Sequence, residues 1–230
     1  MKINRLSATE VANIASLPTE KKRQALLSVE TPKVFWGYDP VRNALPKLLL
    51  SESPLFGHLP KGDDEQLIQQ VMKSCKSGPT QKAACGAVAK AIIQWRNTNE
   101  VVGRNVSPEP LRMSVDTLHY CCDVAPVVGD RLFILHLDCR SSMSLNAAGK
   151  EFMKSLIHHT ARIGDLRDAA VGILRTPKTS HGDRKAVLEE LSGDPVFSLE
   201  EILSMTEETY AIWELILRER RSGSESVAEA

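Results

Sequence analysis

The sequence predicts a mixed α/β fold: a helical N-terminal half followed by a small sheet of about three strands packed with helices. Residues 131–138 form a near-continuous apolar run, which is typical of a strand buried on both faces. An amphipathic stretch over 145–163 and another apolar run over 168–175 follow, and this strand–helix–strand order indicates an α/β layer. In the first half, apolar residues of 79–97 recur at steps of three and four, the period of a helix.

The region 1–100 is expected to be helical apart from one proline-rich segment. Ser7 and Glu10 have the spacing of a capping box, in which the serine accepts from first-turn amides and the glutamate reaches back. We predict helices over residues 8–16, 19–29, 64–74 and 79–97. Residues 31–60 hold five prolines together with aromatic rings, and this composition disfavours long regular elements.

The region 101–221 is expected to form a strand–helix–strand α/β unit that ends in a long helix. Residues 98–110 indicate a loop, so the organisational boundary is placed there. Pro126 argues against a strand through its position. We predict strands over 111–124, 131–138 and 168–175, helices over 145–163 and 199–221, and a disordered tail over 222–230.

Side chains alternate between the two faces of the strand predicted for residues 131–138. Phe133, Leu135 and Leu137 are expected to share one face. Leu132, Ile134 and His136 are expected to share the other face. Both faces are apolar enough to be covered, so this strand is predicted to be the centre of the second half.

Composition excludes several classes of protein. The chain has 42% apolar and 25% charged residues and no apolar run of about 18 residues, so no membrane partner is expected. Its start lacks the apolar core of a signal peptide, and we expect a cytoplasmic protein. The five cysteines show no C-x-x-C spacing, which argues against a disulfide framework or a zinc ribbon. No metal or other cofactor is expected.

Charge is unevenly distributed although the formal net charge is zero. Residues 1–100 hold 14 Lys and Arg against 9 Asp and Glu, and residues 101–185 hold 12 against 9. Residues 186–230 hold 3 against 11. A mildly basic body therefore precedes an acidic C-terminal segment. That asymmetry is found at nucleic-acid or protein contacts, but a solvated acidic helix is the simpler explanation.

A polar cluster at a strand end leads into a basic helix face. Asp138 and Arg140 follow the buried strand, and four bases then recur at steps of four on the predicted helix, namely Lys150, Lys154, His158 and Arg162. Arg140 and these four form a candidate surface for an acidic partner, either nucleic acid or a protein. Nucleic acid is the less favoured of the two.

The same region allows two catalytic interpretations. A metal-dependent nuclease would use Asp138, Glu151 and Asp168 as oxygen ligands and the basic helix face to neutralise phosphates. No Glu-x-Lys pair follows a strand, and Asp138 serves equally well as a cap or as the ion-pair partner of Arg140. Serine hydrolysis is disfavoured because no Gly-x-Ser-x-Gly elbow is present.

The segment Glu52-Ser-Pro-Leu-Phe56 is the most peptide-like part of the proline-rich region. Its Leu55 and Phe56 either anchor a loop into the core or dock into a partner. A second Leu-Phe pair, at Leu132 and Phe133, falls inside the predicted buried strand, so its phenylalanine is expected to be inaccessible.

In size, helix-rich first half, small α/β second half and tail, the chain resembles the SocB family of bacterial toxins, from the SocA/SocB toxin–antitoxin pair. The resemblance implies binding to the DNA polymerase sliding clamp and inhibition of replication. It also implies an antitoxin that acts as a proteolytic adaptor and delivers the toxin to the ClpXP protease. Clamp-binding peptides resemble Gln-Leu-(Ser/Asp)-Leu-Phe, in which the Leu-Phe pair fills an apolar pocket.

Leu55 and Phe56 match the two anchors of that peptide, whereas Glu52 replaces the glutamine and Ser53 the first leucine. Our first hypothesis is a toxin that acts by protein binding, not by catalysis, with Leu55, Phe56 and Glu52 at the contact. The alternative is a metal-dependent nuclease or nucleic-acid-binding protein that uses Asp138, Glu151 and the basic helix face.

Overall fold

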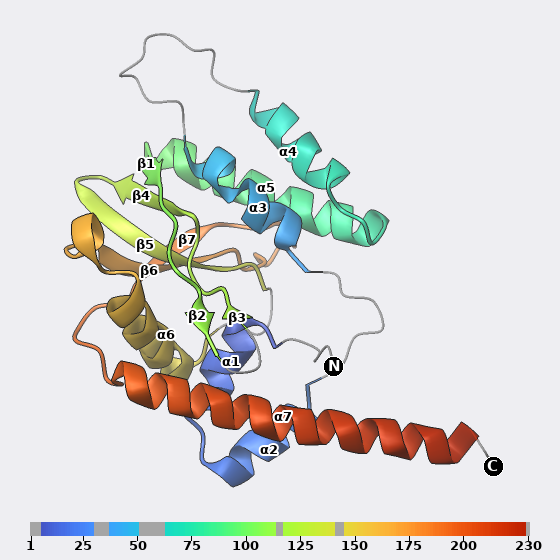
Figure 1. Ribbon diagram of the computed structural model, residues 1–230. Helices are drawn as coiled ribbons and strands as arrows, with labels where there is room; N and C mark the ends of the chain where they lie inside the picture. Colours follow the sequence, from blue (N-terminus) through green and yellow to red (C-terminus); the bar gives the residue numbers. More distant parts are fainter. Residues whose placement is uncertain (1–5, 30–36, 51–62, 114–116, 141–144, 229–230) are drawn as a thin grey trace.

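The computed structural model describes residues 6–29, 37–50, 63–113, 117–140 and 145–228. After Ser222 it describes the backbone alone. A five-stranded sheet in the order β1-β4-β5-β6-β7 lies between two layers of helices (Figure 1). β5 and β6 are parallel and the other neighbours are antiparallel. The strands of this sheet are β1 (Val102–Asn105), β4 (Val124–Val128), β5 (Arg131–Asp138), β6 (Ala170–Arg175) and β7 (Val187–Glu190).

One helical layer covers each face of the sheet. The first comprises α3 (Asp39–Leu49), α4 (Asp64–Lys73) and α5 (Pro79–Thr98). The second comprises α1 (Ala8–Ala15), α2 (Thr19–Leu27), α6 (Ala147–Thr160) and α7 (Leu199–Ala228). The small ladder of β2 (Leu111–Arg112) and β3 (Thr117–Leu118) borders the second layer, and a single 3-10 turn (Gly164–Leu166) precedes β6. The predicted mixed α/β fold is confirmed.

β5 separates two hydrophobic cores, as its alternation predicted. Phe133, Leu135 and Leu137 join the core beneath α3, α4 and α5. Ile134 joins the core beneath α1, α6 and α7. The side chains of β5 therefore hold both helical layers on one sheet.

The long helix α7 begins near the predicted position and covers α1, α2 and α6. Its buried positions recur at the helical period: Ile202, Thr206, Thr209, Tyr210, Trp213, Ile216 and Leu217. At 1.5 Å per residue its 30 residues span about 45 Å. Its backbone stays helical to Ala228, so residues 222–228, which were expected to be disordered, extend the helix.

Two proline-based expectations were wrong. α3 forms inside the proline-rich segment because Pro40 lies in its first turn, where a backbone N–H has no intrahelical partner, and because Val41, Leu45 and Leu48 are fully buried. β4 runs through Pro126. It pairs with β5 only at Val127 and Val128, so the missing N–H of Pro126 removes no rung of that ladder.

Four short strands, β1, β2, β3 and β7, were not predicted as they occur. β1 lies in the expected loop 98–110 and pairs antiparallel with β4, and β7 pairs with β6 beyond the last predicted strand. The strand expected over 111–124 is replaced by β2 and β3, which pair with each other. Ladders of two to four residues are stabilised by their neighbours, so a single segment carries little periodic signal. No helix in the described ranges combines the length and apolar content that a membrane span requires.

Candidate functional site

The carboxyl end of β5 carries Asp138, the first candidate residue. Its side chain is almost completely buried, and its Oδ1 accepts from the Arg140 backbone N–H at 3.2 Å. Its Oδ2 has no hydrogen-bond partner, and burial raises the pKa of the carboxyl. The neighbouring Thr176 is also buried, with its Oγ1 unpartnered. Both atoms are closed off from solvent, so the end of this strand is a buried polar position.

Arg140 is held by the start of α1. Its guanidinium donates to Ser7 Oγ at 2.6 Å and lies 3.2 Å from Glu10 Oε1. The capping box predicted from Ser7 and Glu10 is present, because Ser7 Oγ accepts from Glu10 N while the glutamate accepts from Ser7 N. Arg140 thus ties the β5 end to the α1 cap.

The two lysines of the basic helix face also have partners within the chain. Lys150 pairs with Glu189 of β7, and this ion pair together with Arg175 lowers the pKa of Glu189. Lys154 is buried; its Nζ lies 2.7 Å from Glu151 and donates to the Ser192 carbonyl at 3.3 Å. These contacts attach α6 to β7 and to the loop that follows it.

His158 and Arg162 complete the predicted face. His158 has a buried, unpartnered Nδ1, and burial lowers the pKa of its imidazole. Arg162 donates from Nε to the Arg167 carbonyl at 2.9 Å. With Arg140 and both lysines also engaged, most of the positive charge of this candidate surface is already used inside the fold. Its role toward an acidic partner stays a prediction.

The residues proposed for metal chemistry do not converge. Glu151 is the ion-pair partner of Lys154, and Asp168 is exposed in the turn before β6. Across the described ranges, no group of three or more His, Cys, Asp or Glu side chains has the geometry to hold a metal ion. The nuclease alternative therefore gains no support from this region.

His136 is a buried residue whose part in the structure the sequence did not indicate. Its Nδ1 donates to the Tyr120 carbonyl at 2.7 Å, which leaves Nε2 to accept from Thr9 Oγ1 at 3.4 Å. Complete burial, together with Arg42 and Arg140, lowers the pKa of this imidazole to about 4. A neutral histidine therefore links β5, α1 and the segment after β3. The sequence placed His136 on a covered face of the predicted strand, and that position was the one signal that its imidazole would be buried and hydrogen-bonded.

Of the two Leu-Phe pairs, the structure describes only the one at Leu132 and Phe133. Phe133 is buried in β5, as predicted, and the Arg131 guanidinium lies 5.4 Å from its ring centroid on the outer side. The core beneath α3, α4 and α5 surrounds this ring, so the ring is not free to enter a partner's pocket. Glu52, Leu55 and Phe56 lie outside the described residues, in the stretch of chain that joins α3 to α4.

The sequence of this chain is similar to known bacterial toxins. Residues 9–223 match the family model "Sliding clamp-binding bacterial toxin SocB". The chain is also similar to the "DNA replication inhibitor toxin SocB" of Caulobacter vibrioides (strain NA1000 / CB15N), with 27% identity over 224 residues. That alignment covers 96% of this chain and 93% of the relative. No solved structure matches. The family match extends from α1 into α7, and the chain belongs to the SocB family of sliding clamp-binding bacterial toxins.

Proposed function

We propose that this protein inhibits DNA replication by binding the polymerase sliding clamp, and that it acts in the bacterial cytoplasm by protein binding, without catalysis. The observation that carries the proposal is the family match over residues 9–223, which includes the sheet and both helical layers. The relative from Caulobacter vibrioides, which aligns with 96% of this chain, is itself a DNA replication inhibitor toxin.

We propose Leu55 and Phe56 as the anchors of the clamp contact, with Glu52 at its polar end. Two features support this segment over the other Leu-Phe pair. Phe133 is buried in β5, whereas the segment 52–56 follows α3 and precedes α4 along the chain. Each apolar side chain that fills a pocket contributes about 1.5–3 kcal/mol, so the pair can supply much of the binding free energy.

Replacing both anchors, Leu55→Ala with Phe56→Ala, is expected to weaken clamp binding at least about 100-fold, because two pocket-filling side chains are lost. The measurement is calorimetric titration of the full chain with the sliding clamp of its own bacterium, alongside DNA synthesis after induced expression. Leu215→Ala with Val196→Ala is the matched control, because these two apolar side chains are exposed on and before α7. Unchanged clamp affinity in the anchor variant would exclude the peptide.

The departures at Glu52 and Ser53 allow a test in the opposite direction. Glu52→Gln with Ser53→Leu restores the first two positions of the pattern, while Pro54 stays in place of Ser or Asp, and is expected to tighten clamp binding. A pair of changes that leaves affinity and growth inhibition unaltered would show that this segment does not occupy the clamp pocket.

We further propose that turnover follows the route that the resemblance implies, with an antitoxin acting as a proteolytic adaptor for ClpXP. The support is the family membership.

A further inference from the structure

A groove of about 480 Å³ lies between α3, α4 and the beginning of α5. Leu48 and Val71, both fully or almost fully buried, contribute to its apolar lining. Asn43 and Lys47 of α3 line it from one side, and Lys76, in the turn before α5, lines it from the other. The groove thus has an apolar floor and a polar rim that carries these two lysines and one carboxylate, Asp39, and its volume suits a few side chains.

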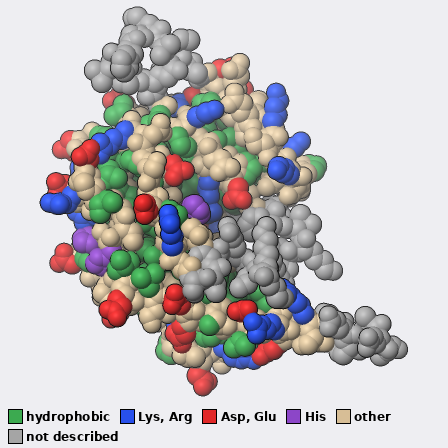
Figure 2. All heavy atoms as spheres, in the orientation of Figure 1, with side chains coloured by type: hydrophobic (Ala, Val, Ile, Leu, Met, Phe, Trp, Pro, Cys, Tyr) green, Lys and Arg blue, Asp and Glu red, His purple; other side chains and the backbone are tan. Residues whose placement is uncertain are grey.

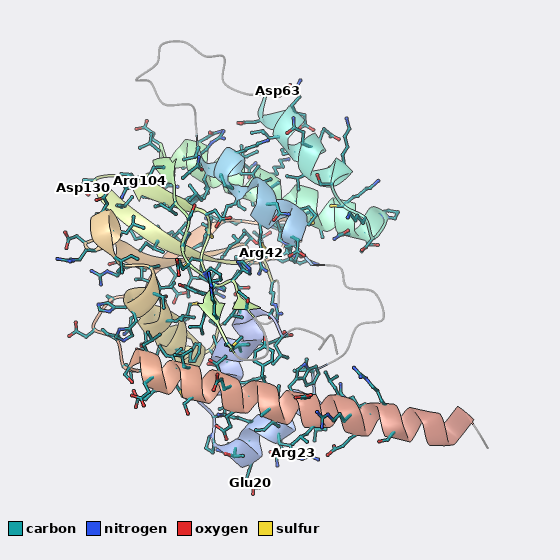
Figure 3. All side chains as sticks on the ribbon, viewed as in Figure 1. Glu20, Arg23, Arg42, Asp63, Arg104 and Asp130 are labelled. Carbon is teal, nitrogen blue, oxygen red and sulfur yellow. The ribbon has the colours of Figure 1, made fainter. Side chains whose placement is uncertain are left out.

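The lysines at this groove have no ion-pair partner within the described part of the chain. No hydrogen bond or ion pair there engages Lys47, Lys76 or Lys73, which precedes the groove residue Ser74 at the end of α4. Figure 2 shows Lys and Arg side chains gathered at the upper right, where α4 ends and α5 begins. Figure 3 places Arg42 at the end of α3 nearer the sheet, away from α4.

The acidic side chains of α4, in contrast, have local partners. Asp63, labelled at the start of α4 in Figure 3, caps that helix by accepting from Glu65 N at 3.0 Å. Asp64 pairs with Arg96 at 2.6 Å, and Glu65 accepts from Gln69. At the groove, Lys47, Lys73 and Lys76 therefore outnumber the single carboxylate of Asp39, and a partner that complements this positive excess presents carboxylates.

The covalent chain sets how far this groove lies from the proposed clamp contact. Phe56 is seven residues after Leu49, the last residue of α3, and an extended chain covers at most about 3.5 Å per residue, so the anchor lies within about 25 Å of the end of α3. Lys47 lies two residues before that end. A protein that holds Leu55 and Phe56 therefore comes within that distance of α3.

We infer that the α3–α4 groove is a second contact site for the sliding clamp and receives an acidic surface segment of the clamp beside its peptide pocket. This inference rests on the proposed function. The lysines attract the acidic segment during the encounter, and the apolar floor receives a side chain from it. The peptide supplies affinity, and the groove sets the rate and orientation of docking.

Charge reversal of the rim, Lys47→Glu with Lys73→Glu and Lys76→Glu, is expected to lower the association rate with the clamp at least about tenfold at low salt. It should also flatten the dependence of that rate on ionic strength, whereas dissociation changes less. The measurement is surface plasmon resonance of the full chain against immobilised clamp at several salt concentrations.

The matched control is Lys21→Glu with Arg167→Glu and Lys185→Glu, which makes the same change of net charge at exposed positions outside the groove. If both triple variants associate equally fast, the groove contact is excluded while the peptide contact stands. Failure of the unaltered protein to bind the clamp would instead overturn the proposed function.

A variant without a charge change tests the shape of the groove. Asn43→Trp, at an exposed lining position, fills the groove and is expected to speed dissociation from the clamp several-fold. An unchanged dissociation rate would show that no clamp side chain enters the groove. Circular dichroism of each variant verifies the fold.

Discussion

At the scale of the residue, His136 couples proton binding to stability. In the folded protein the imidazole has a pKa of about 4, because burial penalises its charged form, whereas a free histidine titrates near 6.5. Between these values the unfolded chain binds a proton that the folded chain excludes. The contribution of His136 to stability is therefore fully present above about pH 6.5 and is lost as the pH falls toward 4.

We expect the free energy of unfolding to fall by about 3 kcal/mol through this residue between pH 7 and pH 4. His136→Asn keeps a donor for the Tyr120 carbonyl and removes the titration, so its unfolding free energy should depend less steeply on pH. Urea unfolding at pH 4.5, 5.5 and 7.5 measures the difference. The exposed His181→Asn serves as control, and equal slopes for the two variants would refute the assignment.

At the scale of the element, α1 and α6 approach each other closely at Gly149. A Cβ built at this position would lie 2.2 Å from Asn13 Oδ1, which is well inside van der Waals contact. The same Oδ1 accepts from Asn146 N at 2.9 Å, and Asn146 caps α6. The first turn of α6 can therefore pack this closely against α1 only because residue 149 is a glycine.

Gly149→Ala is expected to destabilise the protein by about 1–3 kcal/mol, although alanine is intrinsically the better helix former by about 1 kcal/mol. Thermal and urea unfolding measure the change. Gly86→Ala in α5 is the matched control, because the closest atoms to its Cβ would belong to the flexible Met72 side chain, at 3.0 Å, with Ile68 at an ordinary 3.9 Å. Adding Asn13→Ala to Gly149→Ala should recover part of the loss, and a Gly149→Ala protein more stable than the unaltered chain would contradict this packing.

At the scale of the whole molecule, the two cores share β5, and α7 covers one of them. Removing α7 exposes Tyr210, Trp213 and Ile216, together with the apolar side chains of α1 and α6 that they cover. Because Ile134 and Leu135 are adjacent on β5, collapse of one core also removes support from the other. The protein is expected to unfold as one unit.

ClpXP with the adaptor is therefore expected to degrade this protein completely when it starts at the C-terminal end, with no stable fragment left. Gel electrophoresis of a degradation time course with purified protease and adaptor measures this. Accumulation of a protected N-terminal fragment of about 100 residues would show instead that the two predicted regions are independent.

Patterns that belong to one segment were predictable from the sequence. The capping box of Ser7 and Glu10, the two faces of residues 131–138 and the long C-terminal helix depend on spacing within a few turns or along one strand, and the structure confirms each of them. The Leu55-Phe56 candidate also came from local spacing, and it stays a prediction.

The sequence by itself determined the fold class, the central strand and the partition of its side chains, because periodicity is a property of a single segment. Only the tertiary structure decided that β1 and β7 join the sheet, that Lys150 and Lys154 are ion-paired within the fold, and that Lys47 and Lys76 line one groove. These features depend on contacts between residues far apart in the chain, and such pairings arise from packing and electrostatics that no local pattern encodes.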